Sequence, residues 1–312
     1  MEIFYFNGKE VVSTDKLETI KKNKLTWIRF LDQNDENITE FSKFSGIPAE
    51  EFKEFFETEE RSRLEQGDYL ELTYQTPFRD KGDIETTPIN IFIVNNLLIT
   101  VERAKTKVFE QMADSMRKKK LKFLFKKSVG NMLHYFLDEI NDDFLISIDR
   151  ITNLTDVLES KKEHVSNEQL MKLYNYNVTL TYFNQAIIAN LEVLVGLRKS
   201  YFKKFKKEDL RLFSELYYDK LQILDTEKIQ REVIANLFNF QTVVATHRLN
   251  TFMKKLTSLA LIIMVPTFIT GLFGMNVKIP FAESDWAFAF IVGLMIFIAS
   301  VFFVVFKKID WL

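Results

Sequence analysis

The chain has 312 residues, with 42 Lys and Arg against 43 Asp and Glu, and a formal net charge of −1. This balance leaves no basic surplus to neutralise a phosphate backbone, so we expect no nucleic-acid partner. The sequence has no cysteine, which excludes disulfides, thiolate metal sites and cysteine nucleophiles. The only histidines are too far apart for a metal motif of the HExxH kind: His134, His164 and His247.

The first 105 residues show the pattern of an α+β domain. Runs rich in β-branched and aromatic residues predict strands at Glu2–Phe6, Thr26–Leu31 and Tyr69–Gln75. Two further runs, INIFIV and LLITV, flank Asn95-Asn96, which predicts a hairpin turn. Between Thr39 and Phe56 the pattern becomes helical, with a helix start at Pro48. We therefore predict an α+β domain at residues 1–105.

The middle of the chain predicts long helices, because no proline occurs between Lys105 and Pro266. Apolar residues recur there every three or four positions, as in Leu133, Phe136, Leu137, Ile140, Phe144 and Ile148, and in Leu210, Phe213, Tyr217, Leu221 and Leu224. We assign residues 106–255 to a helical domain. No stop signal follows the last helix, which begins near Glu208, so we expect it to continue to Gly271 over about 65 residues, or about 95 to 100 Å.

Two apolar blocks near the C-terminus, residues 256–273 and 286–306, carry no ionised side chain. Each approaches the ~20 residues that a helix needs to cross a bilayer, whereas a buried helix of a soluble protein normally keeps a polar face. Lysines precede the first block and form the tail at 307–312, while the connecting loop, 274–285, has one. We predict a multi-pass plasma-membrane protein with both termini in the cytoplasm, in agreement with an N-terminus that does not resemble a signal peptide.

One face of the long helix carries an unusual stripe of residues spaced by three or four. It is polar in its first half and then apolar or small, apart from one hydroxyl group. An ordinary helix-packing face of small residues is one explanation. The alternative is a pore, which requires a homo-oligomer because two spans cannot enclose one. The stripe comprises Asn236, Asn239, Val243, Thr246, Asn250, Met253, Leu256, Ala260, Met264, Thr267, Gly271 and Gly274.

The first apolar block ends in Gly274-Met275-Asn276, within the segment PTFITGLFGMNVKIP, and the chain ends in KKIDWL. In this setting the chain resembles the CorA family of magnesium transporters, most specifically from Asn250 to Leu312. The resemblance implies a funnel-shaped homopentamer that imports Mg2+, and often Co2+ or Ni2+. It implies that Gly274, Met275 and Asn276 form the selectivity filter. By spacing, it implies that Asn250, Met253, Leu256, Met264, Thr267 and Gly271 line the pore; the stripe adds Ala260 and, in the cytosol, Asn236, Asn239, Val243 and Thr246.

The sequence departs from the family pattern around this motif. Phe273 stands where the family usually has Tyr, and Val277 where it usually has Phe. The loop lacks the usual Met-Pro-Glu and offers Ile279-Pro280, followed by two acidic residues, Glu283 and Asp285. These differences concern the attraction of ions by the loop more than the filter.

The chemistry of Mg2+ agrees with this filter. The ion prefers oxygen ligands and loses its water reluctantly, so amide and carbonyl oxygens of Asn276 and Gly274 can bind it through its waters. The sequence contains neither GxxxxGK[ST] nor GxGxxG, which excludes these nucleotide-binding loops as a source of energy. The membrane potential suffices, because a divalent cation gains roughly 4.6 kcal/mol per 100 mV on entry. We expect a passive transporter and no enzymatic activity.

Gating and feedback complete the expectations. Met253, Leu256 and Met264 would form apolar rings that resist wetting and block a hydrated ion. The resemblance further implies closure by Mg2+ bound to carboxylates between neighbouring cytosolic domains. On the long helix the acidic candidates are Glu208, Asp209, Glu215 and Asp219, of which Glu215 best matches the family position; on the α+β domain they are Asp80 and Asp83 in the loop FRDKGD. A solvated charged face is the alternative explanation.

Two other functions compete with magnesium import. The chain could resemble the related ZntB zinc carriers, although these usually depart from Gly-Met-Asn. It could also be a membrane-anchored oligomeric scaffold or sensor without conductance. The scaffold hypothesis predicts no ion flux and leaves Asn250 and Thr267 unexplained.

Overall fold

The computed structural model describes residues 1–20, 24–31, 34–57, 61–80, 83–160, 166–276 and 285–311. The chain forms two compact units, one comprising Met1–Ala235 and the other Asn236–Leu312. The first unit contains a seven-stranded sheet with helices on both faces, and the second contains two apolar helical segments. Helix α6 (Lys207–Phe273) contributes residues to both units.

The sheet has the strand order β2-β1-β3-β7-β6-β5-β4. Its neighbours are antiparallel except for the parallel pair β3 and β7. The five strands that the sequence predicts are present, whereas the edge strands β2 and β4 are additional, because runs of four residues carry too little periodicity. The bounds are β1 (Glu2–Phe6), β2 (Val11–Thr14), β3 (Thr26–Phe30), β4 (Arg63–Gln66), β5 (Leu70–Asp80), β6 (Asp83–Val94) and β7 (Leu97–Glu102).

The predicted hairpin turn between β6 and β7 is confirmed. Val94 pairs with Leu97, which leaves Asn95 and Asn96 as the two central residues of the turn. Asn95 has a φ of 55°, in the left-handed region that asparagine adopts more readily than most residues. The turn therefore depends on local residue chemistry, which is why the sequence predicts it.

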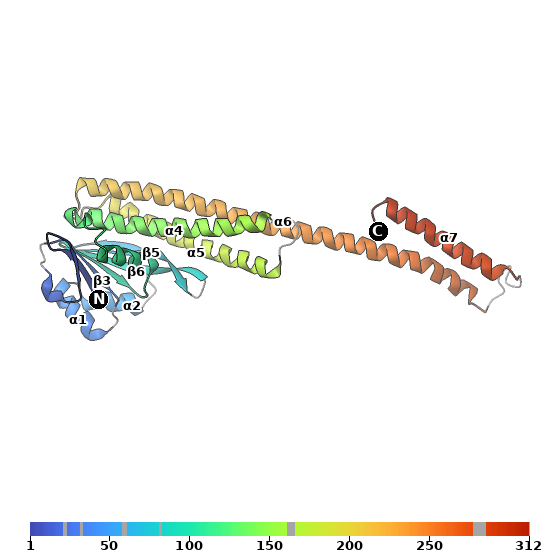
Figure 1. The fold of residues 1–312 in the computed structure, drawn as a ribbon, viewed down its shortest axis with the longest axis horizontal. Coiled ribbons are helices and arrows are strands. Elements are labelled where there is room, and N and C mark those ends of the chain that lie inside the picture. Colours follow the sequence, from blue (N-terminus) through green and yellow to red (C-terminus); the bar gives the residue numbers. More distant parts are fainter. Residues whose placement is uncertain are drawn as a thin grey trace. The chain divides into compact units, whose positions relative to one another are not determined.

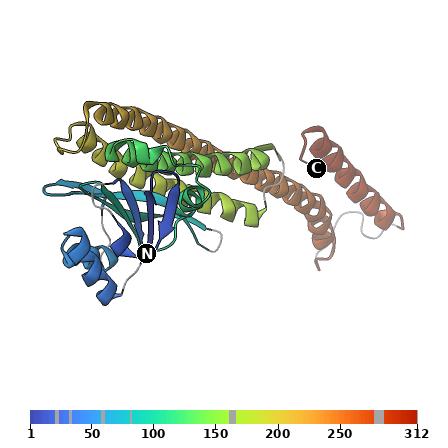
Figure 2. The same cartoon turned by 60° about the vertical axis from the view of Figure 1, so that its left-hand side comes forward.

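One face of the sheet is covered by the short helices α1 (Asp35–Ser45) and α2 (Ala49–Glu57), as Figures 1 and 2 show. The single helical region predicted from Thr39 to Phe56 is two helices, because α1 ends at Gly46 with a φ of 81°. The helices bury a cluster of phenylalanine rings against β3, including a stacked pair, Phe30 and Phe41, with ring centroids 4.8 Å apart.

The other face is covered by α3 (Lys107–Arg117), α4 (Val129–Ser160) and α5 (Asn167–Arg198), with a short 3-10 turn, η2 (Leu124–Lys126), before α4. A second 3-10 turn, η1 (Leu17–Thr19), packs through Leu17 against the cluster under α1 and α2. The predicted apolar stripe of α4 is buried from Leu133 to Ile148. On β3, Trp27 packs edge-on against Phe136 at 4.9 Å. The buried Arg29 donates to Glu102 on β7, which ties the sheet together where no water can solvate the charges.

Helix α6 is continuous from Lys207 to Phe273 and includes Pro266, as the sequence predicts. Three described helices are long and apolar enough to cross a membrane: α5, α6 and α7 (Ala287–Lys308). The most apolar stretch of α5 is 44% buried, and this helix packs on β5 and β6, so it belongs to the core. The corresponding stretches of α6 and α7 are 6% and 0% buried.

These elements confirm the predicted fold class, an α+β domain followed by long helices and apolar C-terminal helices. The predicted boundaries between the cytosolic and membrane segments stay predictions. Within the second unit, α7 runs beside the last part of α6 in both views.

Candidate functional site

The predicted pore stripe lies on one exposed face of α6. All twelve of its residues from Asn236 to Gly274 are exposed in the single chain, and even the apolar Val243 and Met264 are 66% and 56% exposed. On the side of α6 that faces α7, Val265 and Ile269 are partly buried and Ser258 is fully buried. The structure therefore places the stripe away from α7 and leaves it uncovered.

The hydroxyl groups of the stripe are oriented by the helix itself. Thr246 donates its proton to the carbonyl of Thr242, and Thr267 donates to the carbonyl of Ile263, each at 2.8 Å. Because the proton is used within the helix, the hydroxyl oxygen remains available as an acceptor. Such an oxygen can accept hydrogen bonds from the water shell of a cation.

The Gly-Met-Asn segment follows directly on the end of α6. The N–H of Gly274 donates to Thr270 O at 2.9 Å, and the N–H of Met275 donates to Leu272 O at 3.3 Å. A Cβ on residue 274 would lie 3.3 Å from that Thr270 oxygen, so a larger residue would crowd the helix end. The predicted loop residues Val277, Ile279, Pro280 and Glu283 lie outside the described residues.

A groove of about 380 Å³ lies beside two stripe residues, Asn250 and Met253. The C-terminal Trp311 lines it: its ring stacks on Phe306 at 5.8 Å, and its carbonyl accepts from Ser258 at 3.4 Å. This proximity of the tail to the stripe was not predicted from the sequence. The remaining lining residues are His247, Thr251, Lys254 and Thr257.

The carboxylates proposed as Mg2+ sensors separate into different environments. Glu215 and Asp219 are exposed on α6, and Glu215 accepts from Arg211 at 3.2 Å. Asp209 is buried at the start of α6, where it accepts from the Lys206 N–H at 2.8 Å and the Ser128 hydroxyl at 2.5 Å. These contacts give Asp209 a structural role. The exposed Glu208 has no such constraint.

The two candidates on the sheet stand at the end of the β5–β6 hairpin. The backbones of Asp80 and Asp83 pair with each other in the antiparallel register. Their side chains lie outside the described part of the structure. The prediction that they bind Mg2+ therefore stays a prediction.

One further carboxylate on α4, missed by the sequence analysis, lies near Asp219 of α6: Asp138, which is flanked on its own helix by Glu139 and Asp142. Burial raises the pKa of Asp138 to about 6, helped by the negative charges of Asp142 and Asp219. The pKa of His134 on the same helix is lowered by burial, against the opposing effect of Glu215 and Asp219. The sequence shows the acidic run DEINDD, but it does not show which carboxylates of this run face α6.

This acidic group does not form a complete metal site in one chain. Among the described residues, no group of three or more His, Asp or Glu side chains is arranged so that it could hold a metal ion. A divalent cation needs several oxygen ligands at close range. A second subunit would have to supply the missing ligands.

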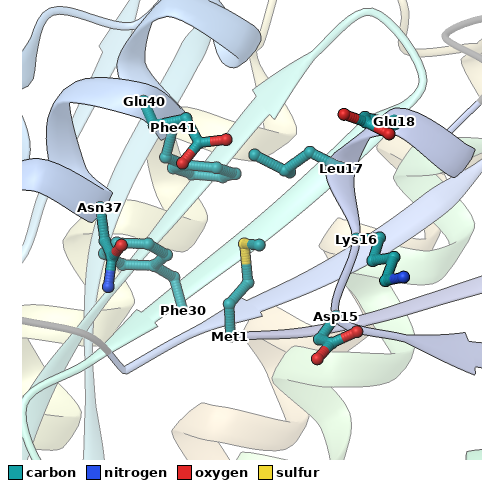
Figure 3. A pocket seen from close by; sticks show the side chains of 9 residues that line it. All are labelled: Met1, Asp15, Lys16, Leu17, Glu18, Phe30, Asn37, Glu40 and Phe41. Carbon is teal, nitrogen blue, oxygen red and sulfur yellow. The ribbon is translucent and has the colours of Figure 1, made fainter.

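A further pocket, of about 520 Å³, lies elsewhere, between η1, β3 and α1 (Figure 3). Its wall includes the rings of Phe30 and Phe41, and the side chains of Leu17 and Met1 project into it. Its other lining residues are Asp15, Lys16, Glu18, Asn37 and Glu40. No residue of the predicted pore, filter or sensor lines this pocket.

Comparison with known proteins identifies one family that matches nearly the whole chain, including α6 and α7. The family model described as "CorA-like Mg2+ transporter protein" matches residues 22–308. The cobalt/magnesium transport protein CorA of Methanocaldococcus jannaschii is 32% identical over 296 residues, 93% of this chain and 92% of its own length. The protein of the same name from Thermotoga maritima is 24% identical over 293 residues, 92% of this chain and 83% of its own.

The solved structures give the same result. The complete structure of the CorA magnesium transporter from Methanocaldococcus jannaschii superposes with a TM-score of 0.91. It covers 100% of this chain and 99% of its own, at 28% identity. Because the match includes the helices of the first unit, α6 and α7, the resemblance seen in the sequence is confirmed, and the chain belongs to the CorA family of divalent-cation transporters.

Proposed function

We propose that this protein imports Mg2+, with Co2+ or Ni2+ as further substrates, passively through a homopentameric pore. Each subunit crosses the plasma membrane at residues 256–273 and 286–306 and keeps both termini in the cytoplasm. Five copies of α6 surround the pore, and five copies of Gly274, Met275 and Asn276 form the filter at its outer end. Closed cyclic symmetry supplies the enclosure that two spans of one chain cannot.

The observation that carries this proposal is the uncovered face of α6. In the single chain, Asn250 and Thr267 are exposed on the same face as the apolar Met264, and α7 covers a different side. Polar side chains within membrane spans almost always face a bundle interior or a water-filled cavity. A central pore hydrates the polar side chains of the stripe. Its assembly from several subunits also buries the edges of the stripe against neighbouring copies of α6.

The proposed filter is suited to a hydrated divalent cation. Its oxygens, the carbonyl of Gly274 and the amide of Asn276, carry no formal charge, so the ion is attracted without being trapped. The potential then drives inward movement with roughly 4.6 kcal/mol per 100 mV for two charges. Relatives named as cobalt/magnesium transport proteins support this choice of ions.

Uptake by liposomes that contain the purified full-length protein tests the proposal. An inside-negative potential should drive Mg2+ entry, and Asn276→Ala should reduce it at least tenfold. Ser300→Ala is the matched control, because Ser300 is an exposed polar residue of α7 that donates only to its own helix, at 2.7 Å to Ile296 O. Wild-type flux in Asn276→Ala would remove the filter assignment.

The same liposomes separate the competing functions. Uptake of Zn2+ but not Mg2+ would identify a carrier of the ZntB kind. Absence of any cation flux from correctly assembled oligomers would favour a scaffold or sensor. Crosslinking of those oligomers in the membrane checks the number of subunits.

We further propose that cytosolic Mg2+ closes the pore by binding between subunits. The support is the acidic surface formed by Glu215, Asp219 and Asp138, which lacks a complete site in one chain. Asp80 or Asp83 of the neighbouring subunit would complete the ligand set. An ion that bridges two subunits only in the closed state stabilises that state by its differential affinity.

Protease protection of the full-length protein against Mg2+ concentration tests this sensor. Wild type should become resistant as Mg2+ rises, and Glu215→Lys should shift the midpoint to higher Mg2+. Glu168→Lys is the matched control, since Glu168 is an exposed residue of α5 paired only with Lys172 at 2.8 Å. An unchanged midpoint in Glu215→Lys would exclude Glu215 from the sensor.

A further inference from the structure

Two short loops of the first unit concentrate an unusual share of its positive charge. Residues 117–127 (RKKKLKFLFKK) contain seven Lys and Arg, and residues 198–207 (RKSYFKKFKK) contain six, with no acidic residue in either loop. Together they hold 13 of the 42 basic residues, which leaves 29 against 43 acidic residues in the rest of the chain. The net charge of −1 therefore conceals a strongly basic region, named here the lysine loops.

The lysine loops meet at one end of the first unit. The hydroxyl of Ser128, just after the first loop, donates to Asp209, just after the second, at 2.5 Å. The N–H of Lys206 donates to the same carboxylate at 2.8 Å. Figures 1 and 2 draw the starts of α4 and α6 side by side at this end. The two charge runs therefore form one surface.

A repeated tripeptide holds the lysines outward. Phe-Lys-Lys occurs three times in the lysine loops, beginning at Phe125, Phe202 and Phe205. Phe125 and Phe202 are each only 9% exposed, and Phe205 packs on Phe202 at 5.4 Å and on Phe213 at 5.1 Å. All six lysines that follow these rings are exposed. The buried rings anchor the backbone, so the positive charges occupy defined positions.

The charges have few partners within the protein. Arg117 binds Glu2 and Asp114, Lys119 binds Glu10, and Arg198 stacks on Tyr217. The other lysines form no ion pair in the described part of the chain: Lys118, Lys120, Lys122, Lys126, Lys127, Lys199, Lys203, Lys204, Lys206 and Lys207. Crowded like charges destabilise a folded chain, and an anionic partner relieves that repulsion.

The position of these lysines is also unfavourable for the helices. Lys126 and Lys127 precede the first turn of α4, and Lys206 and Lys207 stand at the start of α6. Helix N-termini carry partial positive charge and favour acidic residues, so cations there oppose the helix dipole. At α6 the carboxylates of Glu208 and Asp209 offset the helix dipole, whereas the first turn of α4 has no acidic residue, so there the positive helix end adds to the field of the lysines. The region thus attracts anions at a cost to its own stability.

Exposed aromatic rings between the lysines indicate the kind of anion. Tyr201 is 80% exposed; Phe123 is 44% exposed but packs edge-on against Tyr135 at 6.2 Å and lies under Lys127 at 5.9 Å, so Tyr201 is the more accessible ring. Lysine side chains along a surface neutralise a phosphate backbone, and exposed aromatic rings stack with unpaired bases. We propose that the lysine loops bind single-stranded nucleic acid without sequence specificity, against the expectation drawn from the overall charge balance, because 13 basic residues are concentrated in two adjoining segments. This surface is separate from the proposed pore and does not depend on transport.

Fluorescence anisotropy of a fluorescein-labelled 20-residue oligouridylate, titrated with the full-length protein in neutral detergent without Mg2+, tests the proposal. We expect a Kd near the micromolar range at low salt. If six lysines contact phosphates, affinity should fall about 300-fold between 50 and 200 mM NaCl. The substitutions Lys203→Gln, Lys204→Gln, Lys206→Gln and Lys207→Gln together should weaken binding at least tenfold and lower the salt slope by about 3.

The matched control removes four exposed lysines of the same unit outside the loops, namely Lys9, Lys16, Lys24 and Lys43, each replaced by Gln. It should bind within twofold of wild type. If both variants weakened binding equally, the effect would depend on the total charge of the protein alone, and the assignment of the site to the lysine loops would be wrong. Ion flux through liposomes verifies that each variant is folded and assembled.

A second variant tests the base contact. Tyr201→Ala keeps every lysine and should weaken oligouridylate binding about tenfold, while leaving binding of inorganic polyphosphate unchanged. Two results together would overturn the nucleic-acid assignment. Wild type and Tyr201→Ala would bind oligouridylate with equal affinity, and polyphosphate would displace the labelled oligouridylate as effectively, per phosphate group, as unlabelled oligouridylate does. No measurable binding at 50 mM NaCl would overturn the proposal altogether.

Discussion

Replacing Lys220 with methionine should stabilise the first unit and remove a specific part of its pH dependence. Lys220 lies on α6, is 0% exposed, and its Nζ stands 4.0 Å from the ring centre of Phe144 and 5.5 Å from that of Tyr74. Its amine has no hydrogen-bond partner among the described residues, and neither has the hydroxyl of Tyr74. Methionine has a similar length, no proton to lose, and a sulfur that packs well on aromatic rings.

The magnitude follows from proton binding. Burial lowers the pKa of Lys220 well below its ordinary value of 10.5. Between the lowered pKa and the ordinary one, the unfolded chain keeps the proton that the folded protein has released, so stability rises with pH. One proton corresponds to about 1.4 kcal/mol per pH unit. As pH rises between the two pKa values, the wild type should therefore gain stability relative to Lys220→Met, by at most about 1.4 kcal/mol per pH unit.

Hydrogen exchange measured by mass spectrometry on the full-length protein provides the assay, with the opening free energy of peptides between Phe213 and Ile234 as the readout. Comparison of two proteins at each pH removes the intrinsic pH dependence of exchange. Lys172→Met is the control, because this lysine of α5 is 57% exposed and should change the slope little. Parallel pH curves for wild type and Lys220→Met would refute the reasoning, as would a loss of stability in the variant at pH 7.5.

Three further outcomes are expected. Gly130→Ala should lower the free energy of unfolding by about 1 to 3 kcal/mol, measured by thermal unfolding, because a Cβ there would lie 2.6 Å from Cγ of the hydrogen-bonded Asp209. Gly196→Ala should lower it less, because its Cβ would approach only the end of the Leu64 side chain. Asp138→Asn should make the protein more stable than wild type at pH 7.5 and equally stable at pH 4. The folded-state pKa of Asp138 is about 6, above the ordinary 3.8, so wild-type stability falls as pH rises between these values. Equal dependence of the unfolding free energy on pH for both proteins, measured by urea unfolding, would contradict this. Met264→Ser should raise the resting conductance of liposomes if this residue lines a hydrophobic gate, whereas unchanged conductance would place it against another helix.

The sequence alone predicts the features that depend on local periodicity. The long α6, the apolar blocks, the α4 stripe and the turn at Asn95 each follow from residue types within one stretch of chain. The family could also be recognised, because Gly274-Met275-Asn276 stands at a position that the neighbouring span defines. The edge strands β2 and β4 were missed, since pairing with a neighbouring strand creates them and four residues show no period.

Tertiary structure decides which distant residues share an environment. Ser128 and Asp209 are 81 residues apart, yet their contact brings the two lysine loops into one surface. Packing of α6 beside α4 buries Lys220 over the ring of Phe144 without a hydrogen-bond partner, although its own helix would equally allow an exposed lysine. Sequence patterns report how a residue relates to its neighbours along the chain, whereas burial and charge proximity depend on how separate elements pack against one another.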